Sequence, residues 1–120
     1  MKTWILRFRM VDKKNFEEIR RGLKTIETRA ATKKYREIRS GDILQIVCGK
    51  QKMRRRVKKA QRFRSIGEMT AQLDYRKIMP SVQSVSEMRA SYYGYSGYRE
   101  KIKKVGLIAL HLKEITPANS

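Results

Sequence analysis

The stretch spanning residues 43–64 constrains the fold more than any other part of the sequence. Residues 43–48 are almost wholly apolar, which is typical of a central β-strand, and Gly49-Lys50 ends this strand. Residues 50–64 then alternate with a period of two. One parity holds Met53, Val57 and Phe63, and the other holds Lys52, Arg54, Arg56, Lys58 and Arg62. This pattern predicts a second strand, or a long hairpin arm with a bulge, that shows a cationic face.

Three further strands are predicted on either side of this pair. Residues 3–10 alternate, with Trp4, Leu6, Phe8 and Met10 on one face and the polar side chains of Arg7 and Arg9 on the other. A short strand is expected over residues 25–29. Residues 105–113 are apolar on both faces, which favours a central strand that closes the sheet.

Helices are expected between these strands. Asp12 can cap a helix whose apolar stripe is Phe16, Ile19 and Leu23 and which ends at Gly22. Residues 65–68 and 84–87 are capping boxes that predict a short helix and a second one running to Tyr93. A helical turn is expected near residues 35–38, and residues 74–80 are expected to be irregular.

This order of elements favours an α+β fold. We expect a small mixed or antiparallel sheet that closes toward a barrel, with two to four flanking helices. We expect one domain over residues 2–114, a flexible tail at 115–120 and a monomer.

The charge points to polyanionic partners. The 30 Lys and Arg against 11 Asp and Glu give a net charge of +19, and residues 50–64 hold nine of these cations and no acid. Such an excess favours nucleic acid first and an acidic membrane surface second.

The counts of cysteine and histidine exclude two kinds of site. Cys48 and His111 are the only residues of their kinds, so a Cys/His zinc site and an internal disulfide are excluded. Cys48 lies in an apolar strand and is expected to be a small buried hydrophobe. We expect no cofactor, no membrane span, no signal peptide and a cytoplasmic location.

The octet Gly22-Leu23-Lys24-Thr25-Ile26-Glu27-Thr28-Arg29 gathers three charges beside a glycine turn. Period-2 geometry places Glu27 and Arg29 on one face of the strand, with Lys24 at its mouth and Thr28 on the opposite face. Two interpretations stay open from the residues alone. The charges form either a surface salt-bridge set or a site for a polar planar ligand or an anion.

The pattern Gly-x-Lys-x-x-Glu-x-Arg of residues 22–29, with Gly41-Asp42 ahead of an apolar strand, resembles the ASCH family. The resemblance covers roughly residues 2–114. It implies a PUA-like β-barrel and a protein that binds or acts on RNA, a nucleotide or a nucleoside. In this interpretation Lys24, Glu27 and Arg29 form the ligand pocket. The charge run predicts a phosphate-contacting strand that includes Lys50, Arg54, Arg55, Arg56 and Lys58. The other predicted RNA-binding residues are Arg7, Arg9, Tyr92 and Tyr93.

Tyrosines 92, 93, 95 and 98 cluster around two glycines. They are expected either to stack on bases or, where they are spaced by three, to fill the core side of a helix. Both interpretations stay open.

The resemblance also offers an alternative function as a metal-independent hydrolase of RNA or of modified nucleosides. Some similar proteins hydrolyse N4-acetylcytidine with a lysine, a threonine three residues later and a distant glutamate. Lys24 matches the lysine, but Glu27 stands at the threonine position and the distant glutamate has no counterpart. Lys24 and Glu27 would then be the catalytic pair. A deep pocket that buries Lys24 favours the enzyme, and a shallow groove continuous with residues 50–64 favours binding.

Overall fold

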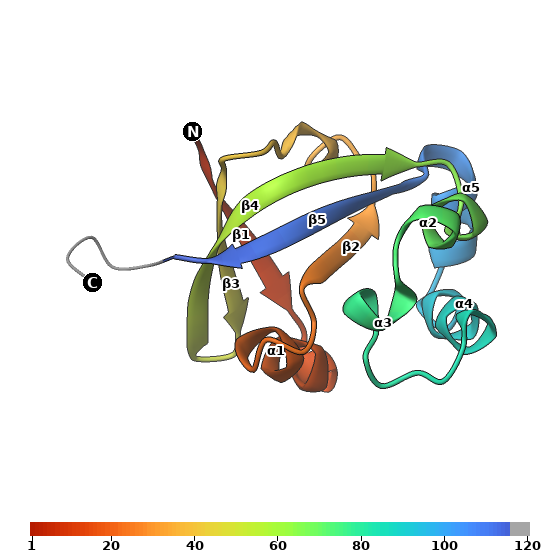
Figure 1. The fold of residues 1–120 in the computed structure, drawn as a ribbon, viewed down its shortest axis with the longest axis horizontal. Coiled ribbons are helices and arrows are strands. Elements are labelled where there is room, and N and C mark those ends of the chain that lie inside the picture. The colour runs from red at the N-terminus through yellow and green to blue at the C-terminus, as the bar shows by residue number, and fades with distance from the viewer. Residues whose placement is uncertain (116–120) are drawn as a thin grey trace.

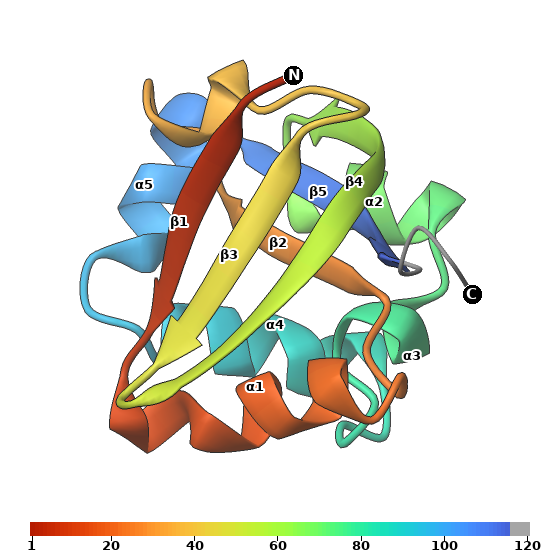
Figure 2. The same cartoon turned by 90° about the vertical axis from the view of Figure 1, so that its left-hand side faces the viewer.

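The protein is built around a single five-stranded sheet. The structure is a computed structural model, and it describes residues 1–115. The strands are β1 (Thr3–Phe8), β2 (Ile26–Ala30), β3 (Ile43–Cys48), β4 (Gln51–Phe63) and β5 (Leu107–Glu114), in the spatial order β1-β3-β4-β5-β2 (Figure 1). The β1–β3 pair is parallel and the other pairs are antiparallel. Figure 2 shows β1, β3 and β4 side by side, with β5 and β2 crossing behind them. The sheet is therefore a half-barrel whose two edge strands are β1 and β2.

The expected hairpin is confirmed, and a bulge divides its second strand. Pairing between β4 and β5 passes from Val57–Leu112 to Lys59–His111, so Lys58 is an extra residue in β4. An extra residue reverses the facing of every side chain that follows it. The expectation that Phe63 shares a face with Val57 was therefore wrong, because Phe63 packs in a different hydrophobic core.

Five α-helices flank the sheet within the described residues, against the two to four expected. They are α1 (Lys13–Arg20), α2 (Ile66–Gln72), α3 (Tyr75–Ile78), α4 (Val85–Tyr93) and α5 (Tyr98–Val105), and short 3-10 helices span Met10–Asp12 and Tyr35–Glu37. Figure 1 places α2 to α5 together at one end of the sheet and α1 apart from them. The α+β class and the mixed, barrel-like sheet are confirmed, whereas the expected tail lies, apart from Ile115, outside the described residues.

Two hydrophobic cores hold these layers together. The first joins α1 to the sheet through Phe16, Ile19, Leu44 and Leu110, and the second joins α2 to α5 to the sheet through residues that include Met69, Met88 and Leu107. Neighbouring residues of β5 alternate between the two cores, which explains why this strand is apolar on both faces. Each large side chain buried in this way contributes about 1.5–3 kcal/mol.

The predicted helix caps are largely confirmed. Ser65 Oγ accepts from the Glu68 N–H at 3.0 Å, and Ser84 Oγ accepts from the Glu87 N–H at 3.1 Å. Residues 74–80 are not wholly irregular, because Asp74 caps the single turn of α3. Asp12 precedes α1 but its side chain accepts no capping hydrogen bond.

Two apolar residues lie outside the cores where the sequence expected them to pack. Met10 follows the end of β1 and is 61% exposed, and Leu23 follows the end of α1 and is 52% exposed. Gly22 ends α1 with a φ of +77°, a conformation that favours glycine, and it turns Leu23 away from the helix stripe. Within residues 1–115 the helices are too short and too polar to cross a bilayer.

Candidate functional site

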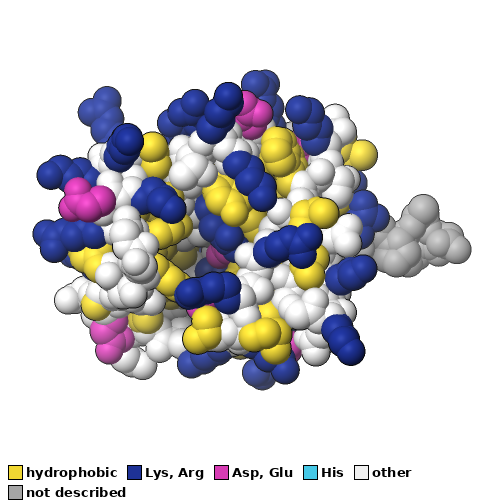
Figure 3. Space-filling model, turned by 180° about the vertical axis from the view of Figure 1, so that it is seen from behind, with side chains coloured by type: hydrophobic (Ala, Val, Ile, Leu, Met, Phe, Trp, Pro, Cys, Tyr) yellow, Lys and Arg dark blue, Asp and Glu magenta, His cyan; other side chains and the backbone are white. Residues whose placement is uncertain are grey.

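A cavity of about 240 Å³ lies where the edge strands β1 and β2 approach each other. Its walls come from the end of β1, the start of α1, β2, and the α4–α5 region. The lining residues are Arg7, Phe8, Arg9, Asp12, Asn15, Lys24, Glu27, Thr28, Arg29, Met79, Tyr92, Tyr95 and Tyr98. Seen from behind Figure 1, the surface is hollowed near its middle, with hydrophobic side chains inside the hollow and Lys and Arg side chains around it (Figure 3).

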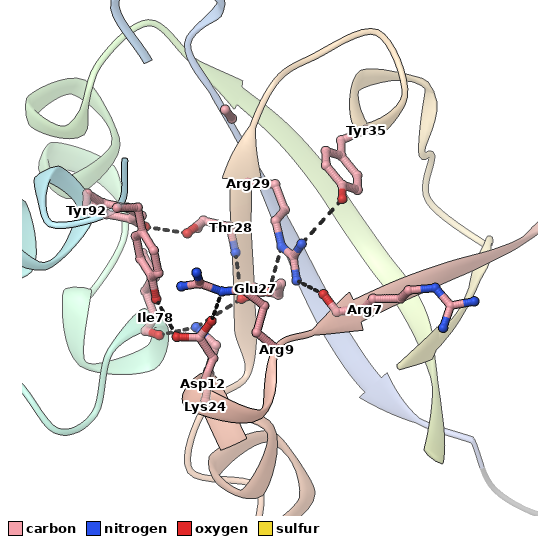
Figure 4. Close-up of polar contacts among 12 residues, drawn as sticks. Arg7, Arg9, Asp12, Lys24, Glu27, Thr28, Arg29, Tyr35, Ile78 and Tyr92 are labelled. Carbon is pink, nitrogen blue, oxygen red and sulfur yellow. Dashed lines mark hydrogen bonds and ion pairs between the residues drawn. The ribbon is translucent and has the colours of Figure 1, made fainter. Parts of the chain in front are cut away.

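The charges of the octet meet in this cavity, as Figure 4 shows. Lys24 Nζ lies 3.2 Å from Glu27 Oε1 and also donates to the Ile78 carbonyl oxygen. Arg29 Nε donates to Glu27 Oε2 at 3.0 Å, and the Thr28 N–H donates to Glu27 Oε1 at 3.2 Å. Glu27 is therefore held between two cations and a backbone donor.

Burial separates this network from a surface salt-bridge set. Lys24 is only 4% exposed and Glu27 only 5%. Burial by itself would raise the pKa of Glu27, but the charges and hydrogen bonds of Lys24 and Arg29 outweigh it and lower that pKa. Burial likewise works to lower the pKa of Arg29, yet Glu27 raises it. Glu27 is consequently ionised at neutral pH.

Arg29 spans the gap between the two edge strands. Its Nη2 donates to the Arg7 carbonyl oxygen at 3.3 Å, and its Nη1 donates to the Tyr35 hydroxyl at 3.4 Å. The guanidinium carbon lies 5.0 Å from the centre of the Phe8 ring and 5.5 Å from that of Tyr35. One side chain therefore links β1 and β2 where the structure records no strand pairing between them.

Three tyrosines from the α4–α5 region form another wall of the cavity. The Tyr92 hydroxyl pairs with the Thr28 hydroxyl, the Tyr98 hydroxyl accepts from the Ala30 N–H at 2.7 Å, and the Tyr92 and Tyr98 rings stack at 6.1 Å. The Tyr95 hydroxyl donates to Asp12 at 3.1 Å, and burial together with that carboxylate raises the pKa of Tyr95 to about 12. Tyr92 is a core residue as well as a wall residue, since it is 3% exposed.

The network leaves hydrogen-bonding groups free to bind a ligand. Lys24 has three N–H donors and Arg29 has five. Within the described residues, two of the Lys24 donors and three of the Arg29 donors have partners. Glu27 Oε2 accepts one hydrogen bond there, although a carboxylate oxygen can accept two. The cavity therefore offers both donors and an acceptor.

The structure separates the sequence-predicted residues into two groups. Arg7, Arg9, Lys24, Glu27, Arg29 and Tyr92 line the cavity, whereas Lys50, Arg54, Arg55, Arg56, Lys58 and Tyr93 do not. Arg55 and Arg54 also point to opposite faces of β4, because adjacent strand residues alternate. Lys24 is buried where it lines the cavity, and no residue of 50–64 is in the lining. By the criterion stated for the sequence, the burial of Lys24 is the feature that favours an enzyme, and the continuous basic groove that would favour binding is not formed by these lining residues.

Sequence reasoning missed Phe8, Asp12, Asn15 and Met79 in the lining. Thr28 also contributes to the lining, although it lies on the opposite face of β2 from Glu27, as expected. Asp12 was interpreted as a helix cap, and no local signal links it to Tyr95, 83 residues away. Among residues 1–115, no group of three or more His, Cys, Asp and Glu side chains could hold a metal ion.

A comparison with known protein families places the chain in one of them. The ASCH domain family matches residues 10–116 of the chain. The chain belongs to the ASCH domain family.

Two solved structures resemble this ASCH domain along nearly its whole length. The crystal structure of hypothetical protein PH0355 is 29% identical, with a TM-score of 0.81 over 96% of this chain and 100% of that chain. The solution NMR structure of protein PF0455 from Pyrococcus furiosus is 27% identical, with a TM-score of 0.71 over 96% of this chain and 99% of that chain. A search among curated proteins gave no match.

Proposed function

We propose that this ASCH domain binds RNA and takes one nucleoside of the strand into the cavity between β1 and β2. The observation that carries the proposal is the buried Lys24–Glu27–Arg29 network facing an open cavity. Sites for drug-sized ligands have volumes of about 300–1,000 Å³. The cavity of about 240 Å³ is smaller than these, which suits a single nucleoside better than a longer segment.

A heterocyclic base matches the chemistry of this cavity. A base edge carries donors and acceptors side by side, and the network offers both kinds of group at fixed positions. Because Glu27 is ionised between Lys24 and Arg29, its oxygens are acceptors at neutral pH. Phe8 and Tyr95 add aromatic side chains to the lining, and the guanidinium groups of Arg29 and Arg9 lie over these two rings.

Phosphates of the same strand would contact exposed cations in the cavity lining and beyond it. Arg7 and Arg9 are in the cavity lining, Lys50 is exposed in the turn before β4, and Lys52 and Arg54 are exposed on β4. Such contacts add affinity without reading sequence, and each adds about 0.7 to the slope of log affinity against log salt for single strands.

Fluorescence anisotropy with a labelled single-stranded RNA tests the two parts separately. Reversing Lys50, Lys52 and Arg54 to Glu should flatten the slope of log affinity against log salt. It should also weaken binding to all RNA sequences alike. The matched control reverses the exposed α5 residues Lys101, Lys103 and Lys104 to Glu, which changes net charge equally. An identical loss in both variants, or an affinity that salt does not change, would contradict the phosphate-contacting role of β4.

A blocking variant tests the cavity. Met79→Trp places a larger side chain in the lining without touching the charges, and Met10→Trp makes the same change at an exposed position outside it. We expect Met79→Trp to abolish any preference among bases while leaving the salt slope unchanged. Base preference that survives Met79→Trp would place recognition elsewhere.

A second candidate is a metal-independent hydrolase of RNA or of modified nucleosides. The observation that favours it is the burial of Lys24 beside Glu27 in the lining of the cavity. Against it, the Thr28 hydroxyl pairs with Tyr92, and in residues 1–115 the polar partners of the Lys24 ammonium are Glu27 and the Ile78 carbonyl. A carboxylate with a lowered pKa is also a weak base.

Incubation with N4-acetylcytidine, followed by chromatography, decides between the candidates. We expect no release of cytidine. Turnover that disappears in Lys24→Ala, with the variant shown to be folded by circular dichroism, would establish the hydrolase instead.

A further inference from the structure

A second cavity, of about 180 Å³, lies beside the β4 bulge and contains none of the residues of the first. It is lined by Thr25, Ile26, Lys58, Gln72, Leu73, Asp74, Lys77, His111 and Leu112. Lys58, Lys77 and His111 are brought to it from β4, α3 and β5. The family pattern of residues 22–29 contributes only Thr25 and Ile26 to this cavity.

Each of the three groups is positioned by a separate feature of the fold. Lys58 is the extra residue of the bulge, and bulges re-aim side chains. Lys77 belongs to α3, which is tied to the start of β2 by the Thr25 N–H donating to the Lys77 carbonyl oxygen at 3.0 Å. His111 Nε2 lies 2.7 Å from Gln61 Oε1, an arrangement that fixes the imidazole ring.

The charges around this cavity are poorly balanced. The positive charges of Lys58, Lys59 and Lys77 all act on His111, and the carboxylate in the cavity lining belongs to Asp74. Asp74 is already engaged, because Arg76 donates to both of its oxygens at 3.1 Å. Among residues 1–115, no ion pair joins Lys58 or Lys77 to a carboxylate. Clustered cations without a counterion repel one another, which an anion would relieve.

We infer that this second cavity binds a phosphate group, held by Lys58, Lys77 and His111. The inference is independent of the proposed role of the first cavity, with which it shares no lining residue. A tetrahedral anion suits the site because its oxygens can accept from Lys58 and Lys77, which come from different elements, and from His111 once its imidazole is protonated. The phosphate comes either from an RNA backbone or from a small phosphate compound.

Binding at this site depends on pH through His111. Burial and the neighbouring Lys59, Lys58 and Lys77 lower the pKa of the imidazole, so it is mainly neutral near pH 7. If Nε2 donates to Gln61, Nδ1 is the nitrogen that gains the proton. A bound anion offsets the lysine charges and raises the pKa, so by linkage the anion binds more tightly as pH falls.

Proton NMR follows this site directly, because His111 is the only histidine of the chain. We expect inorganic phosphate to shift the imidazole signals with saturation, whereas sodium chloride at equal ionic strength does not. Lys77→Gln should weaken phosphate binding about tenfold, since it removes one charged donor. Lys103→Gln, at an exposed position of α5, is the matched control. A parallel titration with sulfate should show tighter binding at lower pH and a raised imidazole pKa.

Three results would overturn the inference. They are an equal shift with chloride, equal behaviour of Lys77→Gln and Lys103→Gln, and no change in the imidazole pKa with sulfate. An oligoribonucleotide without terminal phosphates distinguishes the two possible sources of the phosphate group. A shift of His111 by the oligonucleotide supports an RNA backbone as the natural occupant, and a shift by inorganic phosphate alone supports a small phosphate compound.

Discussion

Glu27→Gln tests whether the buried network holds the cavity together. Glu27 lies 3.2 Å from Lys24 and 3.0 Å from Arg29, and both it and Lys24 are at most 5% exposed. The substitution removes the counterion of two cations that have little access to water. Breaking a buried ion pair in this way costs about 3–5 kcal/mol. That is a large share of the roughly 5–15 kcal/mol by which domains are stable. If the octet were fully exposed, Glu27→Gln would cause almost no loss of unfolding free energy.

The stabilisation by Glu27 should change with pH in a definite direction. The pKa of Glu27 is lowered in the folded protein, despite the opposing effect of burial, by Lys24 and Arg29. The stabilisation from its ionised form is therefore fully present above the unfolded carboxyl pKa of about 4.3 and is lost as pH falls through the folded value. We expect the difference in unfolding free energy between wild type and Glu27→Gln to be constant near neutrality. The difference should narrow once the pH falls below about 4.3, the unfolded carboxyl pKa.

Urea unfolding followed by circular dichroism measures this difference. Glu37→Gln is the matched control, since Glu37 is exposed and should change stability by no more than about 0.5 kcal/mol. Lys24→Met combined with Glu27→Gln should be less destabilising than the sum of the single changes, with a coupling of about 1–3 kcal/mol. A Glu27→Gln protein within about 1 kcal/mol of wild type, with an unchanged pH profile and no coupling to Lys24, would refute the network.

Two further predictions concern the backbone and the tyrosine wall. Gly106→Ala should destabilise the domain in urea unfolding by about 1–3 kcal/mol or more, because Gly106 has a φ of +75° and a Cβ there would lie 2.3 Å from the Phe63 carbonyl oxygen. Gly67→Ala, in α2, should instead be neutral or stabilising, because a Cβ there would make only ordinary contacts, the nearest with Ser65 Oγ at 3.8 Å. Tyr92→Phe should cost about 1–3 kcal/mol, because it leaves the buried Thr28 hydroxyl without its partner. Tyr93→Phe, at an exposed ring, should change little, and equal effects of the two tyrosine changes would contradict the assigned wall.

Features that depend on near neighbours in the chain could be predicted from the sequence. The β3–β4 hairpin follows from an apolar run, a glycine turn and a period of two. The caps of α2 and α4 follow from Ser65 and Ser84, whose side chains reach a backbone N–H only three residues away. The charged octet was also evident, because its three charged residues are within six positions of one another.

Only the tertiary structure decided how these elements meet. Lys24 is buried because the Ile78 carbonyl, 54 residues away, accepts its hydrogen bond, and Asp12 lines the cavity with Tyr95, 83 residues away. One extra residue, Lys58, moves Phe63 into another core, and periodicity alone cannot show where a bulge will form. Local patterns reflect backbone geometry over a few residues. The cavity instead reflects which sheet edges are left unpaired when the half-barrel curls, and that depends on packing across the whole chain.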